Sequence, residues 1–292
     1  MNKSNWKELT INRFDELAIA SNTLHHAAQM IAYTGKHLIN EEPDDSHTSA
    51  VWIPEKNLLA GKPIKTVSTE MRAALYYPSL VLMVTDNDLN ELGSFEMNGK
   101  TKKEALTWLR IQLGELGVDV KNLTDKIHFE IPPHEVETGG VYKLDSPNLF
   151  EELARYRTNG HLVLTHFAAQ FDTASPVLVW PHHFDEGSYI PLQFENGEAI
   201  TSVSMGLAVP DSYYDSPYFY VTAWKKEGVN YENRPEITSP GHWHDHEWTG
   251  QVLEGRSLTG LNQKEQEDVA LGFMKQALEN ALLVAGVTNN LK

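Results

Sequence analysis

The sequence predicts an α+β fold built from two similar halves. Residues 24–29 (LHHAAQ) and residues 165–170 (THFAAQ) read almost alike, and the segments that follow each of them also correspond. In both halves the strand-like segments follow one another instead of alternating with helices, which is typical of antiparallel sheets with helices packed against them. We therefore predict an internal duplication, with one repeat over residues 10–135 and the second over residues 147–288. Each repeat should run helix, antiparallel strands, helix.

The first repeat is expected to open with a helix, because apolar residues recur every three or four positions from Phe14 to Ile31. A strand-like pattern then extends from Val51 to Phe95. Within it, residues 72–77 and 80–84 are separated by a Pro-Ser pair, which predicts a hairpin. Thr101 with Glu104 forms a capping-box pattern that predicts the start of a second helix, and Gly117 is expected to end it.

The second repeat is expected to follow the same order. Helical segments are predicted over residues 149–171, and strands over 177–180, 202–209, 218–224 and 248–253. Asn262 with Glu265 predicts the start of the closing helix, which should end before Gly286. The repeats differ most in an inserted loop over residues 225–246. Long loops in compact domains are often functional.

Composition excludes several classes of protein. Hydrophobic residues make up 41% of the chain and charged residues 22%, as in ordinary globular proteins. The 24 basic residues are outnumbered by 40 acidic ones, and the resulting net charge of −16 disfavours binding to nucleic acid or to an anionic membrane. The absence of cysteine excludes disulfides, thiolate metal sites and a cysteine nucleophile. No apolar run approaches the roughly 20 residues that span a bilayer, and no apolar leader is present, so we predict a cytoplasmic protein.

The inserted loop carries the densest group of histidines. In residues 241–248 (GHWHDHEW), His242, His244 and His246 are two residues apart, so an extended backbone could present all three to one metal ion. Asp245 or Glu247 could then orient a metal-bound water, as in a metal-dependent hydrolase. The alternative is a polar loop beside a strand, because short histidine tracts without supporting motifs are common. We expect that the three histidines do not converge on one metal.

Two histidine–glutamine pairs form the leading candidate for a binding site. His25 with Gln29, and His166 with Gln170, are four residues apart and so share a helix face. Each pair could offer a donor and an acceptor to a ligand held between the two halves. The alternative is a buried histidine bonded to a backbone carbonyl. His166 should either border a cavity, in contact with Trp180, His182 or Asp185, or be enclosed by core side chains.

A further candidate lies at residues 175–185 (SPVLVWPHHFD). Here an apolar strand ends in Trp180, His182 and Asp185, which could place an acid–base set at a sheet edge. A core strand followed by a turn is the alternative. Residues 99–101 (GKT) look like the end of a phosphate-binding loop, but Ser94 stands where that motif requires glycine, so nucleotide binding there is excluded.

Several of these motifs resemble a mainly bacterial family defined by a domain of unknown function. The resemblance rests on the pattern LHxxxQ at residues 24–29 with Gly35-Lys36 nearby, on Ser175-Pro176-Val177, and on Phe184-Asp185. It runs from Trp6 to about Gly286. A second Gly-Lys pair of the family is replaced here by Asp172-Thr173. The resemblance supports the two-part fold and the histidine–glutamine site, and it implies no particular reaction.

The sequence therefore predicts a cytoplasmic protein that binds a small molecule in a cleft between the two repeats. The residues expected to line this cleft are His25, Gln29, His166, Gln170, Trp180, His182 and Asp185. A metal-dependent hydrolase that uses His242, His244 and His246, and a scaffold without an active site, are the alternatives. No cofactor motif accompanies these residues.

Overall fold

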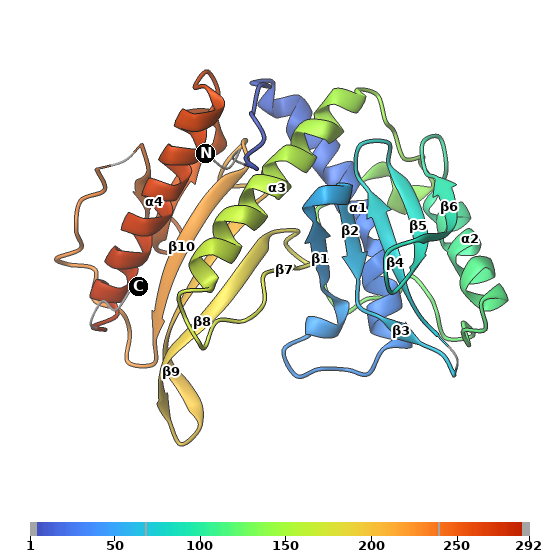
Figure 1. The fold of residues 1–292 in the computed structure, drawn as a ribbon, viewed down its shortest axis with the longest axis horizontal. Coiled ribbons are helices and arrows are strands. Elements are labelled where there is room, and N and C mark those ends of the chain that lie inside the picture. Colours follow the sequence, from blue (N-terminus) through green and yellow to red (C-terminus); the bar gives the residue numbers. More distant parts are fainter. Residues whose placement is uncertain (1–4, 68, 239, 288–292) are drawn as a thin grey trace. The chain divides into compact units, whose positions relative to one another are not determined.

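The computed structural model describes residues 5–67, 69–238 and 240–287. Over these residues the chain has a mixed α+β fold, with α-helices and antiparallel strands, as predicted (Figure 1). It forms two compact units, and each is discontinuous in sequence. We call Asp15–Ala154 with Leu178–Phe184 the N-terminal unit, and Met1–Phe14 with Arg155–Val177 and Asp185–Lys292 the C-terminal unit.

Over its described residues, the N-terminal unit contains two α-helices, the first part of a third, a sheet and three short 3-10 helices. The helices are α1 (Phe14–Leu38) and α2 (Lys102–Glu115), and the 3-10 helices are η1 (Ser46–Thr48), η2 (Pro54–Lys56) and η3 (Glu135–Thr138). The strands are β1 (Ala50–Ile53), β2 (Leu58–Gly61), β3 (Ile64–Lys65), β4 (Glu70–Tyr76), β5 (Val81–Asp86), β6 (Glu91–Glu96) and β7 (Leu178–Val179). They pair in the order β7-β1-β2-β4-β5-β6, with β3 on β4, and all of these pairings are antiparallel.

Helices α1 and α2 of the N-terminal unit both pack against its sheet. A Cβ added to Gly61 of β2 would lie 2.7 Å from the side chain of Ile31, so α1 packs closely against this strand. Helix α2 packs against β5 and β6. It begins at the predicted capping box, in which Thr101 and Glu104 each accept a hydrogen bond from the other's backbone N–H.

The C-terminal unit contains most of α3 (Pro147–Ala168), together with α4 (Gln263–Val284) and the 3-10 helix η4 (Gly255–Ser257). Its strands are β8 (Glu186–Glu195), β9 (Glu198–Ala208), β10 (Tyr218–Lys225), β11 (His242–His244) and β12 (Gly250–Glu254). They form an antiparallel sheet in the order β11-β12-β10-β9-β8. Helix α4 starts at the predicted capping box of Asn262 and Glu265.

Two buried amides of the C-terminal unit bind the segment of residues 6–9. Gln266 of α4 accepts from the indole N–H of Trp6 at 3.2 Å and from the backbone N–H of Leu9 at 2.8 Å. Asn159 of α3 exchanges two hydrogen bonds with the backbone of Lys7, at 2.8 and 2.7 Å. These side chains pair backbone groups that the segment cannot pair within itself.

The two faces of the C-terminal sheet have different neighbours. Gln251 of β12 donates to the carbonyl of Ala277 in α4 at 2.7 Å, and its register partners are Val221 and Trp243. Directly paired residues of antiparallel strands point to the same side, so these residues face α4. The alternate positions therefore face away from α4. They are His242, His244, Val252, Tyr218 and Tyr220.

Most predicted elements are present, but β8 and β11 were not predicted. The hairpin of β4 and β5, the helices with their capping boxes, and the strands corresponding to β7, β9, β10 and β12 are confirmed. β11 lies inside the segment predicted to be a loop, and it pairs with β12. In the part of the chain that the structure describes, none of the helices combines the length and apolar character needed to cross a membrane.

Candidate functional site

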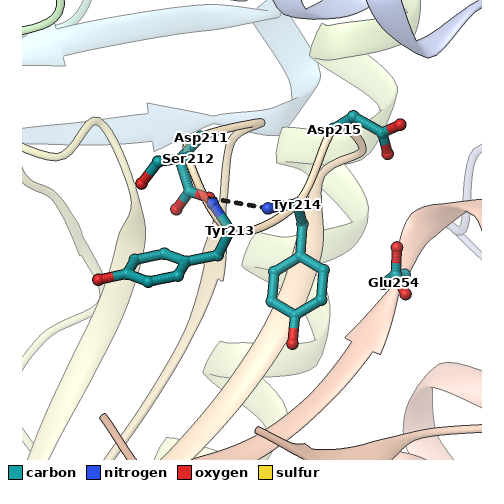
Figure 2. A pocket seen from close by; sticks show the side chains of 6 residues that line it. All are labelled: Asp211, Ser212, Tyr213, Tyr214, Asp215 and Glu254. Carbon is teal, nitrogen blue, oxygen red and sulfur yellow. Dashed lines mark hydrogen bonds between the residues drawn. The ribbon is translucent and has the colours of Figure 1, made fainter. Parts of the chain in front are cut away.

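The face of the C-terminal sheet that points away from α4 is covered by the loop between β9 and β10. Tyr214 from this loop, together with Tyr220 and Trp248, packs on buried Ala208, Tyr218 and Val252. The loop leaves a pocket of about 480 Å³. Its lining residues are Asp211, Ser212, Tyr213, Tyr214, Asp215 and Glu254 (Figure 2).

Asp211 organises this loop. Its Oδ1 accepts from the backbone N–H groups of Tyr213 and Tyr214, at 2.8 and 3.1 Å, which is an Asx turn. Its Oδ2 accepts from the hydroxyl of Tyr218 at 2.7 Å. Burial, and then the hydrogen bond to the Asp211 carboxylate, raise the pKa of Tyr218, which keeps the hydroxyl protonated as a donor. Figure 2 shows the rings of Tyr213 and Tyr214 extending from the loop in different directions.

The other two carboxylates of the pocket share one guanidinium. Arg256 donates from Nε to Oε2 of Glu254 at 2.9 Å and also contacts Oδ1 of Asp215. Partial burial raises the pKa of the Glu254 carboxyl. Three carboxylates therefore line the pocket, and one guanidinium contacts two of them. The local balance of formal charge is negative.

Two histidines of β11 meet the hydroxyl of Tyr214. This oxygen lies 2.9 Å from Nε2 of His242 and 2.7 Å from Nδ1 of His244. The other ring nitrogen of His244, Nε2, lies 2.7 Å from the carbonyl oxygen of His246. Burial raises the pKa of Tyr214 to about 12, so its hydroxyl is a donor at neutral pH. We call Tyr214, His242 and His244 the Tyr214 cluster.

Neighbouring side chains support the Tyr214 cluster. The indole of Trp248 stacks on His244 with a centroid distance of 4.1 Å. The hydroxyl of Tyr213 donates to Oε2 of Glu247 at 2.6 Å. Glu247 has a φ of 66°, in the left-handed region that non-glycine residues rarely occupy, at the turn that follows the carbonyl of His246. The turn is therefore held in an unusual conformation beside the cluster.

The structure gives the three loop histidines different environments. Only His242 and His244 contact Tyr214, whereas the ring of His246 lies 6.3 Å from that of Tyr213. Among the described residues, no group of three or more histidine, aspartate or glutamate side chains has the arrangement of a metal site. Asp245 forms an ion pair with Arg234, so its carboxylate is engaged elsewhere.

His25 and Gln29, the predicted binding pair in the N-terminal unit, both form a hydrogen bond with the same backbone carbonyl. His25 Nε2 lies 2.7 Å from the oxygen of Pro181, and Gln29 Nε2 donates to the same oxygen at 3.0 Å. Both side chains are buried, and the His25 ring stacks on Phe184 at 4.8 Å. A carbonyl can only accept, so Nε2 of His25 carries the proton. A buried histidine bonded to a backbone carbonyl is the alternative that the sequence offered for His25. The two hydrogen bonds connect α1 to Pro181, which lies between Trp180 and His182.

The remaining predicted residues have separate surroundings. Trp180 and His182 form an edge-to-face pair with centroids 6.1 Å apart in the N-terminal unit. In the C-terminal unit, Asp185 accepts from the hydroxyl of Tyr220 at 2.5 Å. His166 is exposed on α3 and its ring contacts Phe167, while Gln170 is half-buried just beyond the helix. Of the two alternatives stated for His166, enclosure by core side chains is wrong, because α3 exposes both Thr165 and His166.

Comparison of the chain with family models, with curated proteins and with solved structures finds no match. The pocket residues were not predicted from the sequence. A signal was present in residues 211–216 (DSYYDS), where two tyrosines lie between acidic residues in a short link between strands. Such a loop is a frequent location of binding residues on a rigid sheet.

Proposed function

We propose that the protein binds a small organic cation in the pocket of the β9–β10 loop. The observation that carries this proposal is the lining of the pocket, which includes the three carboxylate residues Asp211, Asp215 and Glu254 together with Tyr213 and Tyr214. Carboxylates attract a cationic group, and tyrosine rings attract it through their electron-rich faces. Aromatic rings combined with a few polar groups are also the usual lining of small-molecule sites.

The charge balance supports a cation over an anion. Among the described residues, Arg256 forms ion pairs with Asp215 and Glu254 and lies over the ring of Phe14, while Asp211 receives neutral donors. Burial raises the pKa of Glu254, whose carboxylate already pairs with Arg256, and a bound cation would add to the positive charge that favours its ionised form. The net charge of −16 would also raise the local concentration of cations around the protein.

Calorimetric titration with tetramethylammonium and propylammonium, with neutral tert-butanol and propanol as controls, tests the proposal. We expect both cations to bind and the neutral compounds not to bind. Glu254→Gln should weaken cation binding by about tenfold, which corresponds to about 1.4 kcal/mol. The matched control is Glu198→Gln, which neutralises an exposed carboxylate at the start of β9 outside the pocket lining and should leave affinity unchanged. Equal binding of cations and neutral compounds, or equal effects of the two variants, would contradict the proposal.

The cleft predicted between the repeats remains a separate proposal, and the pocket within the C-terminal unit does not depend on it. Binding of a small molecule is common to both. The buried contacts of His25 and Gln29 with the Pro181 carbonyl support a structural role for that pair, so we place the binding site in the pocket.

We also propose that the chain arose by internal duplication. The element order supports this, since α1 is followed by β1–β6 and α2, while α3 is followed by β7–β12 and α4. In an experimental structure, superposition of residues 10–135 on residues 147–288 should align the helices and strands in order, with Gln29 on or near Gln170. A different strand topology in the two halves would contradict the duplication.

A further inference from the structure

With a neutral His244, the donors and acceptors of the Tyr214 cluster can be assigned in only one way. The carbonyl oxygen of His246 can only accept, so Nε2 of His244 donates to it at 2.7 Å. Nδ1 of His244 is then a lone pair, and it accepts from the Tyr214 hydroxyl at 2.7 Å. With its proton directed to His244, the Tyr214 oxygen accepts from Nε2–H of His242 at 2.9 Å.

This direction fixes the tautomer of His242. Its proton lies on Nε2, so Nδ1 carries a lone pair, and Nδ1 makes no hydrogen bond within the part of the chain that the structure describes. His242 is an exposed residue. Desolvation of the ring, and then the neighbouring His244, lower the pKa of His242, which keeps the ring neutral near pH 7.

Tyr214 connects His242 to the pocket. Tyr214 is one of the residues that line the pocket, and its hydroxyl contacts His242, whose ring centroid lies 5.7 Å from that of Tyr214. The carboxylates Asp211, Asp215 and Glu254 are the other groups of the pocket. A ligand that extends along the Tyr214 ring would therefore meet negative charge in the pocket and an acceptor beyond the hydroxyl end.

We propose that Nδ1 of His242, positioned by Tyr214 and His244, is a hydrogen-bond acceptor that selects ligands carrying a second donor group in addition to a cation. This inference rests on the proposed cation site. The ligand class that fits is an amino alcohol or a diamine, in which an ammonium enters the carboxylate-lined pocket and a hydroxyl or amine N–H donates to His242. His242 acts here as a specificity-determining residue.

The first test measures the tautomer and needs no ligand. In ¹⁵N–¹H correlation spectra of the histidine rings, His242 should be in the form protonated at Nε2. Tyr214→Phe removes the acceptor for that proton together with the donor to His244, so it should redistribute the His242 tautomers. The matched control is Tyr213→Phe, which removes the neighbouring hydroxyl bonded to Glu247 and should leave the His242 signals in the wild-type form. A wild-type ring protonated at Nδ1, or no change in Tyr214→Phe, would overturn the inference.

The second test measures selectivity. In calorimetric titrations of the wild-type protein, one or more members of a series of linear amino alcohols should bind about tenfold more tightly than the alkylammonium of equal length. His242→Phe should abolish this preference, so that amino alcohols and alkylammonium ions of equal length bind with equal affinity. If alkylammonium ions bind but no amino alcohol is preferred, the role of His242 is wrong and the cation site stands. If no cation binds, the proposed function fails, and with it this ligand class.

Discussion

The two histidine–glutamine pairs have different surroundings although their sequences are alike. His25 and Gln29 lie on α1, which is buried over most of its length, and both bind the Pro181 carbonyl. His166 lies on an exposed part of α3. Helical spacing fixes which residues share a face, but the packing partner of that face is set by chain segments far away in sequence. The sequence therefore predicted that His25 and Gln29 share a helix, but not the environment of that helix, and Gln170 lies beyond the end of α3.

Substitution of the two histidines should separate these environments. His25→Leu removes a buried donor to Pro181 and the stacking contact with Phe184, so we expect the free energy of unfolding to fall by about 1 to 3 kcal/mol. His166→Gln changes an exposed side chain and should shift it by less than about 0.5 kcal/mol. Urea unfolding followed by circular dichroism measures both. Equal losses would contradict the assignment of a structural role to His25 alone.

Two histidines should make the protein less stable in mild acid. Burial lowers the pKa of His134 in the N-terminal unit, and desolvation lowers that of His242, from an ordinary value of 6.5. The unfolded chain therefore takes up protons at a higher pH than the folded protein. The stability contributed by the neutral rings is fully present above about pH 6.5 and is lost as the pH falls through their folded pKa values.

Unfolding titrations between about pH 7 and pH 5 should show this loss, since most carboxylates titrate below that range. His134→Asn and His242→Asn should each reduce the slope of stability against pH. The comparison variant is His166→Gln, which replaces an exposed histidine. A slope unchanged in both asparagine variants would show that other groups control the acid sensitivity.

Among the elements, the helix starts were the most predictable. The capping boxes at Thr101 and Asn262 depend on residues three apart in sequence, so local spacing is sufficient to find them. Gly117 and Gly286 have φ values of 89° and 74°, as expected for left-handed residues that follow a helix. Sequence patterns predict an element correctly where all of the interacting residues lie within one helical turn of one another.

Loss of a cap should have a measurable cost. Thr101→Ala removes the side chain that accepts from Glu104 N, so we expect a loss of about 0.5 to 2 kcal/mol in unfolding free energy. Thr107→Ala, which replaces an exposed threonine inside the same helix, is the control and should cost less. Thermal unfolding of both variants measures the difference, and a larger effect at Thr107 would contradict the importance of the cap.

Strand β8 was missed for a physical reason. It begins Glu186-Gly187 and contains Pro191, and both glycine and proline are unfavourable inside a strand. The structure accommodates Pro191 with a register irregularity between Pro191 and Gln193. β8 is held by its long pairing with β9, which is a tertiary contact that overrides the local preferences of its residues.

Two glycine substitutions should have effects of opposite sign. A Cβ on Gly206 of β9 would lie 2.4 Å from the hydroxyl oxygen of Tyr220, so Gly206→Ala must displace the ring that donates to Asp185. We expect a destabilisation of about 1 to 3 kcal/mol. Gly272 in α4 has open space at the same position, so Gly272→Ala should stabilise by about 0.5 to 1 kcal/mol. Chemical unfolding measures both, and a neutral Gly206→Ala would contradict the close packing of Tyr220.

At the scale of the whole molecule, the sequence predicted the fold class but not which segments associate. Residues 1–14 belong to the C-terminal unit, and residues 178–184 to the N-terminal unit. Such exchanges depend on single buried amides, such as that of Gln266, which no periodicity reveals. The pocket was missed for a similar reason, because Glu254 and the loop around Tyr214 meet only through the register of β10 and β12.

The charge of the chain should make its stability depend on salt. The 24 basic and 40 acidic residues give a net charge of −16, and repulsion among the excess carboxylates is greater in the compact state than in the unfolded chain. The screening length falls from about 30 Å at 0.01 M to about 8 Å at 0.15 M ionic strength. The same screening weakens the attraction within exposed ion pairs, but this loss of stability is small, because such pairs contribute at most about 1 kcal/mol each. We therefore expect the melting temperature to rise when sodium chloride is added over this range at pH 7, with an equal osmolarity of sucrose as the control for non-ionic effects. A melting temperature that falls with salt would show that attractive pairs such as those of Arg256 and Lys102 outweigh the net repulsion.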